Sequence, residues 1–173
     1  MLIFDRCVLV TGKGFPDLAT RALVHTLYNE LKIPVLGLCD GNPYGISVLA
    51  MYHCAGNRMG VDGGTRFGVP IKWLGLRPSH VAELEDELPK TVFQKLTELD
   101  YKRADALLDE TNPFLNGENR EERQDEILAM QDGGYKVELE ALYWIGPDYM
   151  SSWVEGMLVQ IDEEGEENQM VAI

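Results

Sequence analysis

Residues 33–46 constrain the fold more than any other part of this 173-residue chain. An apolar run ends abruptly at Asp40, and Gly41, Asn42 and Pro43 follow before a second apolar segment begins. This order is typical of a buried strand, a tight turn and a helix whose first position is a proline. Ligands of open α/β sheets lie at the carboxyl ends of strands. The sequence therefore predicts a carboxylate at a strand tip, where it can hold a hard cation or transfer a proton.

Two other apolar runs, over residues 6–11 and 69–76, also predict buried strands. A helix is expected after Asp17, which is a plausible N-cap, and a second helix over residues 43–54. Strand–helix–strand order implies parallel pairing with right-handed crossovers. The predicted fold class is α/β, with a parallel sheet flanked by helices.

Residues 55–70 form a glycine-rich connection that also carries Arg58 and Arg66. Such a loop can approach a phosphate backbone closely, or it can be an ordinary connection between a helix and a strand. Both interpretations remain open at this point.

The pattern changes after residue 80, where no strong strand signal occurs. Ser79 is a candidate N-cap, and helical spacing follows over residues 81–88, 89–109, 120–131, 135–142 and 147–159. Residues 162–168 read as a disordered acidic segment. We therefore expect a sheet-bearing part over residues 1–80, a helical section over residues 81–160 and an acidic tail over residues 161–173.

The two halves differ strongly in charge. Residues 1–80 contain eight Lys and Arg against five Asp and Glu, a net charge of +3, whereas residues 81–173 contain seven against twenty-four, a net charge of −17. Binding to phosphates requires cationic groups. The first half can therefore face a nucleic acid, while the second half fits a solvated helical face or a surface for a basic partner.

Several classes of site and location are disfavoured. The three cysteines and three histidines do not occur at the spacing of a metal site. No stretch has the length and apolar character of a membrane span, and the N-terminus lacks a secretory signal pattern, which favours an intracellular protein without a membrane partner.

Asp40 with Asn42 is the sharpest candidate site. Their oxygens, at alternate positions after a strand, are the hard ligands that Mg²⁺ prefers. The alternative is that both side chains cap the following helix and shape the turn.

Cations end the neighbouring strands. Lys13 stands between two glycines after the first strand, and Arg77 ends the third. We expect these residues to converge with Asp40 in a metal–phosphate site; a plain turn at Lys13 and an Arg77–Asp40 ion pair are the alternatives. Phe15 and Tyr44 also follow strand tips, where they can pack on a sugar or base, or on the sheet.

Residues 8–21, 40–45 and 72–79, taken together and in this order, resemble the A-type chain of type IIB topoisomerases (topoisomerase VI) and its eukaryotic relative, the meiotic double-strand-break transesterase. Residues 136–142 resemble the final helical segment of that family, so the resemblance covers most of residues 6–160.

This resemblance implies a Toprim domain that lacks its first strand, with Mg²⁺ held by Asp40 and Asn42 and double-stranded DNA near Lys13, Phe15 and Arg77. The family cuts DNA by attack of a tyrosine on a phosphodiester, with two A-type chains acting as a homodimer and, in the topoisomerase, an ATPase of the B type as partner. The resemblance implies either a topoisomerase or a protein of meiotic double-strand-break formation, and Asn42 favours the meiotic role and thereby a nuclear protein. Because Asn is neutral, metal affinity should be lower than with two acids.

The resemblance also implies what this chain does not contain. The Toprim glutamate is expected on a strand before residue 6, and the nucleophilic tyrosine on a domain further upstream, so no catalytic residue is assigned and the chain alone is not expected to cleave DNA. A second hypothesis is a non-catalytic module of this family that binds DNA or a partner. A third, another Mg²⁺-binding α/β domain such as a receiver or a haloacid dehalogenase, lacks its diagnostic acidic patterns.

Overall fold

The computed structural model describes residues 7–54, 67–116 and 119–170, with side chains up to residue 161. The chain divides into two compact units. One comprises residues 10–139, and the other contains residues 7–9 and 140–170. The division at residues 80 and 160 that the composition suggested stays a prediction. Across the described part of the chain, no helix has the length and apolarity that crossing a membrane requires.

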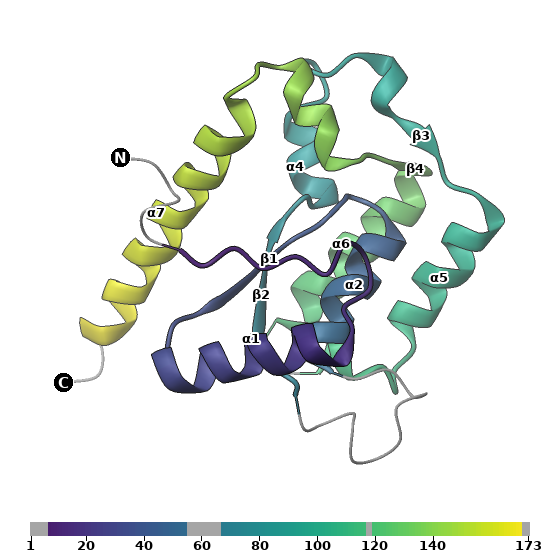
Figure 1. The fold of residues 1–173 in the computed structure, drawn as a ribbon. Helices are drawn as coiled ribbons and strands as arrows, with labels where there is room; N and C mark the ends of the chain where they lie inside the picture. Colours follow the sequence, from purple (N-terminus) through teal and green to yellow (C-terminus); the bar gives the residue numbers. More distant parts are fainter. Residues whose placement is uncertain (1–6, 55–66, 117–118, 171–173) are drawn as a thin grey trace. The chain divides into compact units, whose positions relative to one another are not determined.

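A two-stranded parallel sheet lies at the centre of the larger unit (Figure 1). Strand β1 (Val35–Leu38) pairs with β2 (Ile71–Gly75), and Val35 lies opposite Ile71. Helix α2 (Pro43–His53) follows β1 in the crossover between the strands. The predicted parallel pairing and the helix start at Pro43 are therefore confirmed.

Helix α1 (Leu18–Leu31) precedes the sheet. The side chain of Asp17 accepts a hydrogen bond from the N–H of Thr20 at 2.7 Å, which confirms the predicted N-cap. The helix ends at Lys32, which adopts a left-handed conformation with φ 55°. The N-cap follows from local sequence, whereas a lysine in the left-handed conformation at the helix end does not, because this position favours Gly or Asn.

The predicted first strand over residues 6–11 is wrong for the described residues 7–11, which form no strand. Val8 and Leu9 are 55% and 69% exposed instead of buried. An apolar run becomes a strand only where another strand pairs with its N–H and C=O groups, and β1 pairs only with β2 among the described residues.

The remaining elements are mainly helical. In chain order they are α4 (Pro78–Glu83), η3 (Lys90–Val92), β3 (Gln94–Lys95), α5 (Glu98–Leu108), η4 (Pro113–Leu115), α6 (Arg120–Gly133), β4 (Tyr135–Lys136), η5 (Leu139–Trp144) and α7 (Tyr149–Met170). Strands β3 and β4 form a short antiparallel pair.

Four details of the helical half differ from the prediction. The helix expected over residues 89–109 begins only at Glu98, because the residues before it form η3 and β3. Arg77, and not Ser79, occupies the N-cap position of α4. Residues 135–142 form β4 and η5 instead of a helix, because Gln94 and Lys95 of β3 supply strand partners. Helix α7 continues to Met170, through the segment expected to be disordered, consistent with the good helix propensity of glutamate.

The core of the larger unit lies between β2 and helices α2, α5 and α6, which pack against one another (Figure 1). Its buried side chains are Cys39, Ile46, Leu49, Ile71, Trp73, Ala104, Leu107, Phe114, Leu115, Ile127 and Met130.

One buried charge joins α6 to the sheet. The guanidinium of Arg123 donates to the carbonyl oxygens of Phe114 (2.6 Å) and Ile71 (2.8 Å) and lies 4.5 Å from the centre of the Phe114 ring. Because both carbonyls are buried with it, these hydrogen bonds fix α6 against β2 and thereby the helix face described below.

Candidate functional site

Asp40 lies just beyond the carboxyl end of β1, as predicted, and is half-buried. Its Oδ1 accepts a hydrogen bond from the backbone N–H of Leu139 at 3.0 Å. The carbonyl of the next residue, Gly41, accepts from the N–H of Val137 at 3.1 Å. The segment that follows β4 therefore holds the Asp40 turn from outside the sheet, a contact that no local sequence signal indicated.

Asn42 caps helix α2. Its Oδ1 accepts from the N–H of Gly45 at 2.7 Å, and its own N–H donates to the carbonyl of Asp40 at 2.8 Å. The capping alternative therefore applies to Asn42, whereas the carboxylate of Asp40 bonds to Leu139 instead. A cap does not exclude a second role, because an amide oxygen has two lone pairs.

Gly45 makes the close approach of this turn to α2 feasible. A Cβ added to Gly45 would lie 2.4 Å from the carbonyl oxygen of Asp40, closer than any real Cβ contact. Any side chain at position 45 would therefore clash with the backbone of Asp40. This close packing explains why residue 45 is a glycine.

Arg77 lies after β2, and its side chain contacts β2 and α6. Its Nε donates to the carbonyl of Trp73 at 3.0 Å, and its guanidinium forms an ion pair with Glu122 of α6. Within the described part of the chain, no ion pair joins Asp40 to Arg77 or to Lys13. The alternative of an Arg77–Asp40 ion pair is therefore not found among the described residues, and the convergence of Lys13, Asp40 and Arg77 on one metal–phosphate site stays a prediction.

Lys13 and Phe15 lie in an exposed turn before α1. Lys13 has φ 52°, and its N–H donates to the hydroxyl of Thr11 at 3.1 Å. A Cβ added to the preceding Gly12 would lie 3.2 Å from the hydroxyl of Tyr52 in the last turn of α2, whereas Asn42 caps the first turn. Lys13 and Phe15 are exposed and therefore accessible to a ligand.

The neighbouring thiol of Cys39 is buried, and Mg²⁺ prefers oxygen over sulfur ligands. Burial, and secondarily the charge of Asp40, raise the pKa of Cys39 well above its ordinary value, so the thiol stays protonated at neutral pH. Over residues 7–54, 67–116 and 119–161, no three His, Cys, Asp or Glu side chains are grouped to share a metal ion. The oxygens of Asp40 and Asn42 are thus the candidate ligands in this turn.

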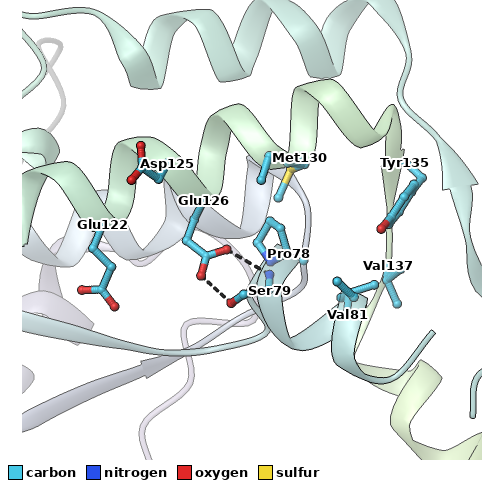
Figure 2. A pocket seen from close by; sticks show the side chains of 12 residues that line it. Pro78, Ser79, Val81, Glu122, Asp125, Glu126, Met130, Tyr135 and Val137 are labelled. Atoms are coloured by element: carbon cyan, nitrogen blue, oxygen red, sulfur yellow. Dashed lines mark hydrogen bonds between the residues drawn. The ribbon is translucent and has the colours of Figure 1, made fainter. Parts of the chain in front are cut away.

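A second polar site was not anticipated from the sequence. Glu126 of α6, only 9% exposed, accepts hydrogen bonds from the N–H (3.0 Å) and the hydroxyl (2.5 Å) of Ser79 at the start of α4 (Figure 2). One sequence feature could have indicated this site. Glu126 is an acid that directly precedes the apolar Ile127 in a predicted helix, so its side chain could be expected to be partly buried. Glu126 also lines a pocket of about 410 Å³ that Gly41 borders.

Comparison with known proteins identifies the family. Residues 3–154 match the family model for the Toprim domain of Spo11 and of the A-type chain of topoisomerase 6. The chain belongs to this family. The Toprim match includes both strands, the Asp40 turn and α6, and it bears out the fold class expected from the sequence.

Relatives of two kinds match the Toprim chain. It is 34% identical over 157 residues to meiotic recombination protein SPO11-2 of Oryza sativa subsp. indica, covering 90% of this chain and 38% of the relative. It is 35% identical over 145 residues to meiotic recombination protein SPO11 of Mus musculus, covering 84% and 35%. The A-type chain of DNA topoisomerase 6 from Arabidopsis thaliana is 36% identical over 145 residues, covering 84% and 33%. The chain thus spans between a third and two fifths of the length of these relatives.

Proposed function

We propose that this chain is the Toprim portion of a DNA-cleaving transesterase that forms meiotic double-strand breaks, with Asp40 and Asn42 as its metal ligands. The observation that carries the proposal is the fixed position of Asp40 at the carboxyl end of β1. Its carboxylate is held by Leu139, and its backbone is packed against Gly45. A carboxylate fixed in this way is preorganised for a cation.

The donor set fits Mg²⁺. A carboxylate offers about four acceptor positions, of which Leu139 uses one on Asp40, and the oxygen of Asn42 keeps one lone pair beside the bond from Gly45. Mg²⁺ in phosphate-processing sites keeps several waters and needs only one or two carboxylates from the protein. When bound, the ion would supply positive charge to a DNA phosphate.

DNA binding is proposed for the positively charged first half of the chain. Lys13 and Phe15 are exposed and can contact a phosphate and a sugar or base. Arg77 is already paired with Glu122, so a DNA phosphate would have to share this guanidinium with Glu122 or replace it. A nuclear location, pairing with a second copy and a partner of the B type belong to the same proposal, supported by relatives named for meiotic recombination and for DNA topoisomerase 6.

Manganese titration with NMR line broadening tests the metal site. In the wild-type chain we expect broadening centred on residues 37–44. It should vanish in Asp40→Ala and persist in Asp132→Ala, which removes an exposed acid of α6. Broadening confined to the acidic residues beyond 161, or no broadening, would contradict a metal site at Asp40.

A specific observation favours the alternative of a partner-binding module without metal chemistry. Asp40, Asn42 and Arg77 each already have a partner within the chain, and these bonds serve the fold. The same titration separates the two functions, because the alternative predicts no broadening at residues 37–44 and the same result for the wild type and Asp40→Ala.

A further inference from the structure

A pocket of about 410 Å³ lies between α4, α6 and the segment around β4, within the larger compact unit. Gly41, Ser79 and Ala129 are among the residues that line it. Its volume falls in the range of sites that enclose a ligand group.

The pocket has an acidic end and an apolar end (Figure 2). Glu122, Asp125 and Glu126 follow one another along α6, while Tyr135 and Val137 lie at the opposite end. A ligand that fits both ends must combine an apolar part with a cationic part.

The acidic end keeps an excess of negative charge. The lining contains three carboxylates and no Lys, Arg or His. Glu122 is neutralised by Arg77, but the nine-tenths buried Glu126 is bonded by the N–H and hydroxyl of Ser79, which carry no charge. Asp125 lies at the edge of the pocket. A buried carboxylate with only neutral donors favours the approach of a cation.

We propose that this pocket binds an arginine side chain, flanked by apolar residues, from a protein partner. The aliphatic stem of arginine can lie along the apolar wall while its planar guanidinium pairs with Glu126. The exposed Asp125, whose side chain points away from Glu126 in Figure 2, adds negative charge nearby. Nucleic acid is disfavoured here because its phosphates carry the same charge as the lining. The strongly acidic second half of the chain, to which α6 belongs, suits a basic partner as a whole.

Peptide titration followed by NMR tests this site without relying on the metal proposal. The probe is the capped tripeptide N-acetyl-Leu-Arg-Leu-amide, and its control replaces Arg by citrulline, which is nearly isosteric but neutral. We expect saturable shifts of the backbone amides of Gly41, Ser79 and Ala129 with the arginine peptide. Binding should be about tenfold weaker with citrulline and should weaken further with added salt.

Variants of the chain localise the effect. Glu126→Gln keeps an oxygen that can accept from Ser79 but removes the charge, so binding should fall about tenfold while the fold is retained. Ala129→Leu fills the pocket from its α6 wall and should abolish binding. Glu121→Gln makes the same charge change on α6 outside the lining and should bind like the wild type.

Three outcomes would overturn the proposal. They are equal binding of the citrulline peptide, unchanged binding by Glu126→Gln and Ala129→Leu, or saturable shifts of the Ser79 and Ala129 amides with MgCl₂ but not with the arginine peptide. The Gly41 amide is left out of the MgCl₂ comparison because it adjoins Asp40. The last outcome would make the pocket a simple cation site. None of them bears on Asp40, whose manganese titration has a separate readout.

Discussion

Leu139 donates its backbone N–H to Oδ1 of Asp40 at 3.0 Å, although the two residues are 99 positions apart in the chain. The bond joins the segment after β4 to the turn after β1. Together with the Val137–Gly41 backbone bond, it fixes the turn that carries the candidate metal ligands. The position of Asp40 therefore depends on a part of the chain that contributes no ligand itself.

Two substitutions of Asp40 should separate its structural from its metal-binding role. Asp40→Asn keeps an acceptor for Leu139 and should lower the free energy of unfolding by less than about 1 kcal/mol, whereas Asp40→Ala leaves a half-buried N–H without its acceptor and should lower it by about 1–3 kcal/mol. Both should lose manganese binding. Urea denaturation and manganese titration measure the two effects, and retained metal binding in Asp40→Asn would show that its charge is not needed.

Asn42→Asp should strengthen metal binding without harming the helix. Asp and Asn are equally good N-caps, so the bond to Gly45 is kept while a second carboxylate is added. We expect tighter manganese binding with nearly unchanged stability. Asn42→Ala is the matched control, because it removes the N-cap and should lower the free energy of unfolding by about 1 kcal/mol. Unchanged manganese affinity in Asn42→Asp would remove Asn42 from the set of ligands.

Gly45→Ala should displace the Asp40 turn, although Gly45 itself contributes no metal ligand. The added methyl would lie 2.4 Å from the carbonyl oxygen of Asp40, so the turn or α2 must shift. We expect a drop of about 1–3 kcal/mol in the free energy of unfolding, the range for overpacking, together with weaker manganese binding. Gly156→Ala in α7 meets nothing within 4 Å and should instead be neutral or stabilising by up to about 1 kcal/mol. Equal effects of the two substitutions would contradict the packing argument.

The Asp100–Lys136 ion pair predicts a pH dependence of stability. Burial raises the pKa of Asp100, but the hydrogen bonds from Lys136 (2.8 Å) and Thr97 outweigh it, so the pKa lies below its ordinary value of 3.8. A lowered folded-state pKa means that the pair stabilises the fold above the unfolded-state pKa, and that this contribution is lost as pH falls through the folded-state value.

Urea denaturation between pH 6 and about pH 2 measures this contribution. We expect the wild type to lose stability as the pH falls below about 4, with a shallower loss in Asp100→Asn. Asp132→Asn, which removes an exposed charge from α6, is the control. Identical pH profiles of the wild type and Asp100→Asn would show that the pair does not stabilise the fold.

The sequence by itself determined the features that are set within a few residues. The cap at Asp17, the start of α2 at Pro43 and the position of Asp40 after β1 follow from side-chain oxygens, the fixed φ of proline and an apolar run ending at an acid. The resemblance of three short segments also identified the Toprim family, which the family match bears out.

Only the tertiary structure decided which groups meet across long separations. The partner of Arg77 is Glu122, 45 positions away, and Ser79 bonds to Glu126, 47 positions away. The exposure of Val8 and Leu9 was also not predictable from the sequence, because an apolar run does not specify whether another strand will pair with it. Local pattern fixes dihedral preferences and the buried side of an element, but the meeting of two distant side chains depends on how whole elements pack, and it was this packing that placed Leu139 against Asp40.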